Sequence, residues 1–301
     1  MSRSVSLFFY ACLLWITVVP LCGNVHAQTT EPCTYTLFKY PGARTISTSA
    51  NGINQYQTIV GTAQDQTGTV FGFIRYSNGS FKRVAVSGSY NTQLFRRNAS
   101  GTTVGFYQSA SGRKHGLLLS GSTITTIDYP GATDTVLTGI NKWGSIVGYY
   151  TDGTGHFKGF KRYSGGGFAK VSIPNHSDIM PMAIADNGVI VGTLGAGGPI
   201  GIHGFTFNQG SWQTYDDPDY PAGSTGLNGF NGRVFVGEAF DSNGTGHAIQ
   251  LVGNSFYSNI VVPNAVESFA GDVFHGTFTN VVVGGATISG GGNQAFIGQC
   301  Q

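Results

Sequence analysis

The chain carries little charge. Asp, Glu, Lys and Arg make up 10% of its 301 residues, and the formal net charge is +2. Nucleic-acid-binding domains and membrane-surface segments gather Lys and Arg into basic patches or runs. The near-neutral composition therefore excludes an electrostatic binding surface for nucleic acid or for an anionic membrane.

Common enzyme motifs are also missing. The sequence has no G-x-S-x-G nucleophile elbow, no H-E-x-x-H zinc motif, no P-loop and no C-x-x-C pair. These motifs place a nucleophile, metal ligands or phosphate-binding amides at fixed spacing. Their absence leaves scattered carboxylates, histidines and arginines as the candidates for chemistry.

The first 27 residues predict a secretory signal peptide. Arg3 gives a positive start, Leu7 to Leu21 is an apolar run, and Val25-His26-Ala27 fits a small-x-small cleavage site. We expect cleavage after Ala27, which leaves 15 basic and 14 acidic residues in 28–301. The mature chain is then exported and has no membrane association.

Two other interpretations of this segment are less favourable. An uncleaved anchor is disfavoured because Pro20 and Gly23 interrupt a run already shorter than the ~20 residues that span a bilayer. A lipid anchor on Cys22 is disfavoured because the residue before the cysteine is the large Leu21.

Cysteine is scarce in the mature chain. Two of the four cysteines fall within the signal peptide, and only Cys33 and Cys300 remain. Two cysteines at the ends of an exported chain predict a disulfide that joins the termini. The ends must then lie within about 6 Å, Cα to Cα, which a ring-shaped fold satisfies.

Glycine and apolar residues, by contrast, are abundant. The chain has 47 glycines and 21 phenylalanines, and 40% of its residues are hydrophobic. The apolar content argues against disorder. Low charge with many Gly, Ser, Thr and Asn residues suits a secreted all-β protein built from tight turns.

An aliphatic residue followed by glycine recurs at nearly constant spacing. The copies are Val60-Gly61, Val104-Gly105, Val147-Gly148, Val191-Gly192, Val236-Gly237 and Val283-Gly284. Successive glycines are 43 to 47 residues apart. A period in this range, with Gly and aromatic punctuation, is typical of a β-propeller or a similar closed array.

The third repeat divides into four strands, A to D. We expect them at Thr133–Asn141, Ser145–Tyr150, Phe157–Arg162 and Phe168–Ile173. Short β-rich runs joined by Gly- and Asn-rich turns indicate an antiparallel meander.

The phase of the repeat predicts how the chain closes. Tyr35–Gly42 matches Ile124–Gly131, so the chain begins with a strand D, and it ends with a strand C, Gln294–Gln299. We therefore predict an all-β, six-bladed β-propeller in one domain, 28–301, with four-stranded antiparallel blades. The N-terminal strand completes the last blade beside a Cys33–Cys300 disulfide. Seven blades are the main alternative, but no residues are left for another blade.

The repeat resembles a known family. The pattern Gly139-Ile140-Asn141 followed by Gly144-Ser145-Ile146-Val147-Gly148 is similar to the bacterial extracellular repeats of the HAF family, and the likeness covers 33–300. It implies a secreted or periplasmic bacterial protein and no particular activity. Lys158, Ala248 and Ala295 replace residues of the repeat's H-G-F step.

Three acids occupy equivalent positions at the start of strand A: Asp134, Asp178 and Glu267. They could converge at the channel, with His176 nearby, to hold Ca²⁺ or to provide an acid/base pair for sugar chemistry. The alternative is that each accepts backbone N–H bonds in its own turn. The acidic loop Asp216–Asp219 has the same two interpretations.

Arg96 and Arg97 depart from the repeat. Equivalent positions hold Gly52-Ile53, Gly139-Ile140 and Ala183-Ile184. An arginine lining the channel could bind a carboxylate or sulfate. The alternative is a structural pair with a neighbouring acid or an exposed strand end.

Glu238 is the only carboxylate at its position in strand B, where partial burial would raise its pKa and suit it to act as an acid. A satisfied or exposed strand residue is the alternative. Tyr149 and Tyr150 are candidates for stacking on sugars, although most aromatics should pack between blades. His115, His203 and His247 recur about once per repeat and are interpreted as structural hydrogen-bonding residues.

Two functions follow from these candidates. The first is a monomeric binding module for extracellular carbohydrate or a protein partner. The second is a polysaccharide hydrolase or lyase using Asp134, Asp178, Glu267 or Glu238, with Arg96 binding an acidic sugar. Carboxylates about 5–10 Å apart in one cleft would favour the enzyme.

Overall fold

The computed structural model describes residues 33–300 except 43, 196–200, 222, 253–254, 258–259 and 276–279. The predicted signal peptide and its cleavage site lie outside the described residues. Within these residues the regular structure consists of β-strands, and no apolar helix of membrane-spanning length is found there.

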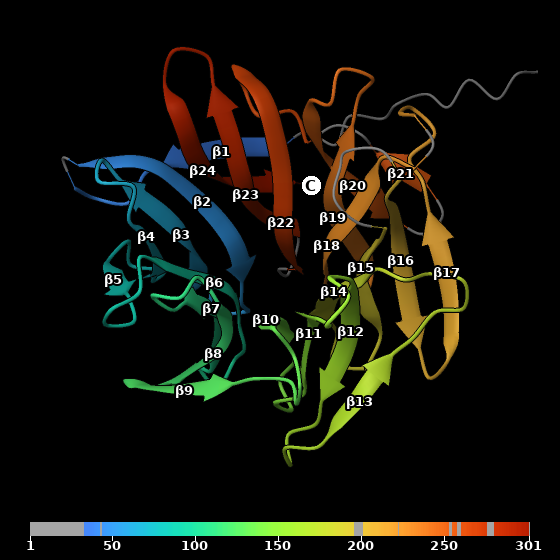
Figure 1. Cartoon of the computed structure of the whole chain (residues 1–301). Helices are drawn as coiled ribbons and strands as arrows, with labels where there is room; N and C mark the ends of the chain where they lie inside the picture. The colour runs from blue at the N-terminus through green and yellow to red at the C-terminus, as the bar shows by residue number, and fades with distance from the viewer. Residues whose placement is uncertain are drawn as a thin grey trace, which may run out of the picture.

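The strands form four-stranded antiparallel meanders, which we number as units in chain order (Figure 1). Unit 1 contains β2 (Thr45–Ile53), β3 (Ile59–Asp65), β4 (Val70–Arg75) and β5 (Phe81–Val84). Unit 2 contains β6 (Asn91–Arg97), β7 (Thr103–Gln108), β8 (Lys114–Ser120) and β9 (Thr123–Ile127). Unit 3 contains β10 (Asp134–Ile140), β11 (Ile146–Thr151), β12 (Phe157–Arg162) and β13 (Phe168–Val171). A single parallel bridge, Val70 to Asn91, joins units 1 and 2 into one larger sheet.

The second half of the chain repeats this arrangement. Unit 4 contains β14 (Ile179–Ile184), β15 (Ile190–Leu194), β16 (His203–Asn208) and β17 (Ser211–Tyr215). Unit 5 contains β18 (Thr225–Phe230), β19 (Val234–Phe240), β20 (Gly246–Val252) and β21 (Ser255–Tyr257). Unit 6 contains β22 (Ala265–His275), β23 (Asn280–Ile288), β24 (Gly292–Cys300) and the N-terminal β1 (Cys33–Phe38). The four strands expected in the third repeat agree with β10 to β13 within two residues at each end.

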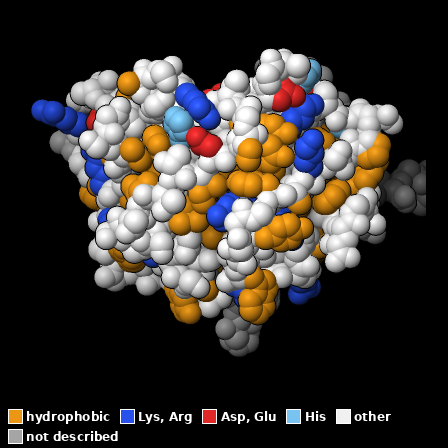
Figure 2. All heavy atoms as spheres, turned by 60° about the horizontal axis from the view of Figure 1, so that its bottom comes forward, with side chains coloured by type: hydrophobic (Ala, Val, Ile, Leu, Met, Phe, Trp, Pro, Cys, Tyr) orange, Lys and Arg blue, Asp and Glu red, His pale blue; other side chains and the backbone are white. Residues whose placement is uncertain are grey.

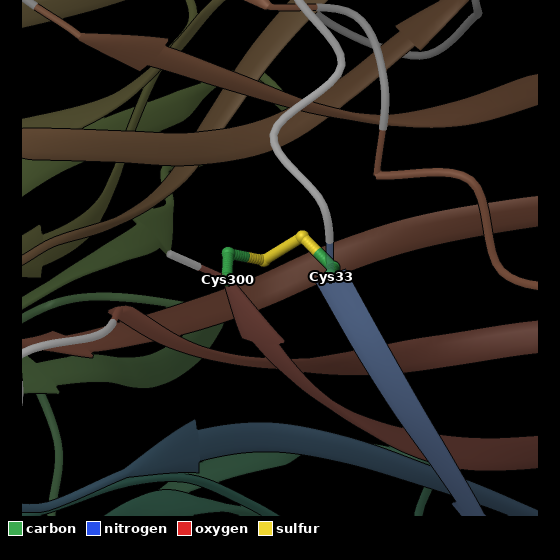
Figure 3. Close-up of a disulfide and its surroundings, with 2 residues drawn as sticks. All are labelled: Cys33 and Cys300. Carbon is green, nitrogen blue, oxygen red and sulfur yellow. A yellow bond between two sulfur atoms is a disulfide. The ribbon is translucent and has the colours of Figure 1, made fainter.

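The predicted meeting of the chain ends is confirmed. β1 pairs antiparallel with β24, and Cys33 lies opposite Cys300 in the register. Their sulfur atoms form a disulfide across a Cα–Cα distance of 4.1 Å (Figure 3). In the chain-entropy model, a link over so long a segment adds on the order of 5 kcal/mol to stability.

Each unit packs on the next through a shared apolar cluster. Val60 of unit 1 packs with Leu94 and Leu117 of unit 2, and Val147 of unit 3 packs with Phe205 of unit 4. The remaining neighbours share clusters in the same way, and units 6 and 1 join through Phe73 with its neighbours in β23 and β24. Figure 1 shows the units arranged around a common centre, with strand A of each unit nearest to it.

The repeated glycine of strand B has a steric cause. A Cβ at Gly61 would lie 2.1 Å from the carbonyl oxygen of Ser49, and one at Gly105 would lie 1.9 Å from that of Gln93. The other four glycines meet a strand A carbonyl at 1.9 to 2.2 Å. Strand A has a register shift at or next to this point in every unit, so only glycine fits beneath the displaced carbonyl.

The asparagine of the Gly-Ile-Asn motif joins neighbouring units. Asn141 Oδ1 accepts hydrogen bonds from the Trp143 and Ser145 amides and so caps its own A–B turn. Its Nδ2 donates to the carbonyl of Ala185 in the next unit at 3.4 Å. Asn54 and Asn98 donate in the same way to the following unit.

The surface reflects the composition. On the face drawn in Figure 2, charged side chains are few and lie scattered among uncharged ones.

Candidate functional site

Two of the three predicted strand A acids serve the backbone. Asp134 Oδ1 accepts a hydrogen bond of 2.7 Å from the Lys114 amide at the start of β8. Asp178 accepts one of 2.8 Å from the Phe157 amide at the start of β12, and also contacts Ser177 and His156. Each acid therefore fastens strand A of its unit to strand C of the preceding unit.

Glu267, at the equivalent position of unit 6, is arranged differently. Its nearest hydrogen-bond donor among the described residues is Thr287 Oγ1, at 3.5 Å from Oε2. The neighbouring Ser268 instead joins the two units, because its Oγ accepts from the Ala248 amide of unit 5 at 3.1 Å. Glu267 is left exposed at the end of the ring where strand A of each unit begins.

The three acids do not form a common cation site. Among the described residues, no group of three or more His, Cys, Asp or Glu side chains is placed to hold a metal ion. Asp134 and Asp178 are directed to backbone amides of different units.

Arg96 reaches the centre of the ring. Its guanidinium donates to the carbonyl oxygens of Asn51, Phe95, Asn228 and Gly271, which belong to units 1, 2, 5 and 6. Its Nε lies 3.2 Å from Oδ2 of Asp272. The N–H groups of Arg96 are therefore all directed to other groups of the protein. Arg96 forms a structural pair with a neighbouring acid, one of the two interpretations offered from the sequence, and it joins units across the centre.

Asp272 is the residue that sequence reasoning missed. It pairs in register with Val283, as Arg96 does with Val104, so the two hold the same repeat position, where other units have Gly or Ala. Burial raises the pKa of Asp272, while Arg96 and the Ile53 amide oppose the shift. An alignment of all six units places Arg96 and Asp272, which have opposite charges, at one repeat position, and this coincidence is the sequence signal for their ion pair.

The remaining predicted residues lie away from the centre or within the packing. Arg97 donates to Thr103 Oγ1 at 2.8 Å and lines the opposite mouth of the ring. His176 packs edge-on against Trp212 of β17, the outer strand of unit 4. Tyr150 stacks on Tyr129 with ring centroids 3.9 Å apart.

Tyr149 packs against Phe157, and burial raises its pKa to about 12. His115 and His203 lie 2.8 and 2.9 Å from Asp128 and Asp216, and the His247–Asp241 separation is 3.4 Å. Each histidine of the series thus forms a structural pair with an aspartate of its own unit, in units 2, 4 and 5.

Glu238 connects two cavities. The mouth pocket, about 240 Å³, lies where unit 6 meets units 5 and 1, and Glu238, Glu267 and Phe269 help to line it. The central cavity, about 310 Å³, is lined by strand A residues of all six units, with Arg96 and Glu238 among its walls. Glu238 and Phe269 belong to both cavities.

Small residues flank the Glu238 side chain. Gly226 and Ala248 lie opposite it in the register, and a Cβ at Gly226 would meet Thr193 Oγ1 of unit 4 at 3.0 Å but Glu238 Cγ only at 3.9 Å, an ordinary contact. In unit 6 the sizes are exchanged, with Phe269 opposite Gly285. A Cβ at Gly285 would lie 2.5 Å from the Phe269 ring, so the absence of a side chain there lets the ring form one wall of the pocket.

The surroundings of Glu238 make its carboxyl harder to ionise. Burial and, secondarily, the charge of Glu267 raise the pKa of Glu238 to about 7. Among the described residues neither carboxylate takes part in an ion pair. At neutral pH the Glu238 carboxyl is therefore partly protonated, and the mouth pocket places it together with the exposed Glu267, a combination suited to acid/base chemistry or to the binding of polar ligands.

Comparisons with known proteins concern the fold. No family model matches the sequence, and no curated protein matches it. A mutant of AofleA from Arthrobotrys oligospora with three arginines changed to alanine superposes with a TM-score of 0.55 at 14% identity, covering 85% of this chain and 84% of that one. A Trypanosoma rangeli sialidase in complex with sialic acid gives 0.56 at 10% identity, with 89% and 58% coverage.

TolB from Acinetobacter baumannii gives a TM-score of 0.51 at 14% identity, and the match covers 82% of this chain and 65% of TolB. Identities this low establish a shared fold and leave activity to be argued from the site.

Proposed function

We propose that this chain is an exported β-propeller that binds extracellular carbohydrate at the mouth of its central channel. The observation that carries the proposal is the pair Glu238 and Glu267, which face one pocket and have no partner cation among the described residues. Glu238 departs from the repeat at its strand B position. Glu267 shares its position with Asp134 and Asp178 but differs in its hydrogen bonding, because it accepts from Thr287 Oγ1 where they accept from a strand C amide.

The proposal includes six blades and a ring that is closed by the N-terminal strand, which completes the last blade. Each four-stranded unit packs on the next, unit 6 packs on unit 1, and β1 supplies the outer strand of unit 6. The resemblance to HAF repeats and the predicted signal peptide support an exported bacterial protein. We expect a monomer, with neither nucleic acid nor membrane as a partner.

The lining of the mouth pocket suits a sugar. Ser49, Thr287 and Asn293 offer hydroxyl and amide groups beside the two carboxylates, and Phe269 adds an aromatic wall. Sugars present hydroxyls at their edges and C–H groups on their faces, so they are held by such mixtures of polar and aromatic groups. The fold likeness to a sialidase solved with sialic acid is consistent with a carbohydrate ligand.

A polysaccharide panel tests the proposal. The melting temperature of the mature protein should rise with a bound polysaccharide, and the rise should disappear in the Glu238→Gln/Glu267→Gln variant. Asp186→Asn is the matched control, because Asp186 is an exposed acid at the opposite mouth. A rise that survives in the double variant would place the site elsewhere, and no response to any sugar would favour a protein partner.

A second function, glycoside cleavage, is favoured by one observation. Glu238, whose pKa is raised, shares the mouth pocket with Glu267, and two carboxyl groups in one cleft match the acid and base roles of a glycosidase. Release of new reducing ends during the same screen, lost in either single Glu→Gln variant, would make the protein an enzyme. Stabilisation without product release would keep it a binding module.

A further inference from the structure

We propose that the mouth pocket recognises a protonated amino sugar, an inference that rests on the carbohydrate-binding function proposed above. The ligand is defined by its charge: a hexosamine unit whose amine is free and carries a proton.

The charged residues that line the site favour a ligand with a positive charge, such as an amino sugar. The titratable side chains around the mouth pocket and central cavity are Glu238, Glu267 and Arg96. Arg96 is occupied by Asp272 and four backbone carbonyls, so its donors are directed away from a ligand. Two carboxylates then face the ligand without a free cation, an arrangement that attracts an ammonium group and repels a carboxylate or sulfate.

The shape of the site limits how a ligand enters. Arg96 crosses the centre at the level of the Asn51 and Gly271 carbonyls, between the central cavity and a smaller space beside Asp272. A sugar therefore enters from the mouth that carries Glu267. An ammonium group has three donors, which allows it to contact both carboxylates while a sugar face lies against Phe269.

Binding should displace a proton. With a pKa of about 7, the Glu238 carboxyl is mostly protonated at pH 6 in the free protein. A primary amine keeps its proton at this pH. An ammonium group bound beside Glu238 favours the carboxylate, so the O–H bond breaks and the proton passes to the buffer. A neutral sugar gives no such ionisation.

Oligosaccharides of equal length that differ in charge test the amino-sugar inference. Isothermal titration at pH 6, in two buffers of different ionisation enthalpy, would compare a glucosamine oligomer with its N-acetylated form and with a hexuronate oligomer of equal length. We expect the free-amine oligomer to bind at least about tenfold more tightly than the other two and to release up to one proton. Glu238→Gln should abolish proton release, Glu238→Gln/Glu267→Gln should remove the preference, and Asp186→Asn should change neither.

The failures are distinguishable. If the acetylated or acidic oligomer binds as tightly and the glutamate variants weaken it, the mouth is a carbohydrate site and the amino-sugar inference is wrong. If no oligomer binds, or binding is unaffected by the double variant, the proposed site and the inference fail together.

Discussion

Two acidic side chains, Asp272 and Glu238, lie on opposite sides of Arg96, and they differ in whether a partner neutralises their charge. Asp272 is buried against the guanidinium and also accepts a hydrogen bond from the Ile53 amide. Glu238 faces two cavities and forms no ion pair among the described residues. Both break the repeat, but only the acid without a partner keeps its charge available to a ligand. A departure from the repeat therefore points to function only when its neighbours leave it unsatisfied.

Among these variants, replacement of Arg96 should lower the stability of the protein most. Arg96→Met would leave Asp272 buried without its partner, and such losses destabilise a protein by about 3–5 kcal/mol. Urea unfolding at pH 7 measures the change. Adding Asp272→Asn should recover part of the loss, because the uncompensated charge disappears. A loss below about 1 kcal/mol for Arg96→Met would contradict the role given to the pair.

Asp217 is a buried acid with one unsatisfied carboxylate oxygen. It is 1% exposed; its Oδ1 accepts a hydrogen bond of 3.0 Å from the Asp219 amide, but its Oδ2 has no hydrogen-bond partner among the described residues. Burial raises its pKa to about 6. The connection between units 1 and 2 has Val86 at the position that Asp217 holds between units 4 and 5, and the amides of both residues donate to a strand A threonine of the following unit. The raised pKa makes the ionised form unfavourable above about pH 6, and the penalty fades as the pH falls toward 3.8, the usual value.

Asp217→Val should therefore stabilise the protein by about 1–2 kcal/mol at pH 8. The gain should shrink at pH 4, and sugar binding should not change. Denaturant unfolding at both pH values measures the effect. A variant less stable than the wild type at pH 8 would show that Asp217 has an unrecognised favourable role.

Glu238→Gln separates binding from stability. The folded pKa of about 7 lies above the ordinary 4.5, so wild-type stability should increase as the pH falls from 7 to 4.5. The variant should lack this dependence and be more stable by about 1–2 kcal/mol at pH 8, a range reduced for the partial exposure of the side chain. Thermal melts at pH 5 and 8 measure it. Equal pH dependence in both proteins would contradict the raised pKa.

Asp178→Asn changes one of the two strand A acids that accept a backbone amide, and it should have the smallest effect. Burial acts to raise the pKa of Asp178, but bonds from Phe157, Ser177 and His156 lower it below its usual value. Its stabilising contribution is therefore present above about pH 4 and lost as the pH falls further. We expect a loss of about 1 kcal/mol at pH 7 by urea unfolding, with sugar binding intact. Loss of binding in a folded variant would move the site toward unit 4.

The regular parts of the fold could be predicted from the sequence. The six Val-Gly steps are visible because each glycine avoids a strand A carbonyl, so the steric requirement recurs with the repeat. The Cys33–Cys300 pairing could be predicted because the chain starts with the strand that its last unit lacks.

The site could be predicted only in part. Glu238 could be found as the single carboxylate at its strand B position. Its place in one pocket with Glu267 depends on how units 5 and 6 pack, and on Ser268 rather than Glu267 accepting the strand C amide of unit 5. The Arg96–Asp272 pair joins residues far apart in the sequence, and strand spacing does not determine how far side chains reach.

NMR titration of the glutamate side-chain carboxyl carbons shows whether Glu238 is an unpaired carboxyl held beside Glu267. We expect one resonance with a midpoint near pH 7 that is absent in Glu238→Gln and whose midpoint falls when the free-amine oligosaccharide is added. If every glutamate resonance titrates near the ordinary 4.5, Glu238 is an ordinary exposed strand residue and the proposed site is wrong.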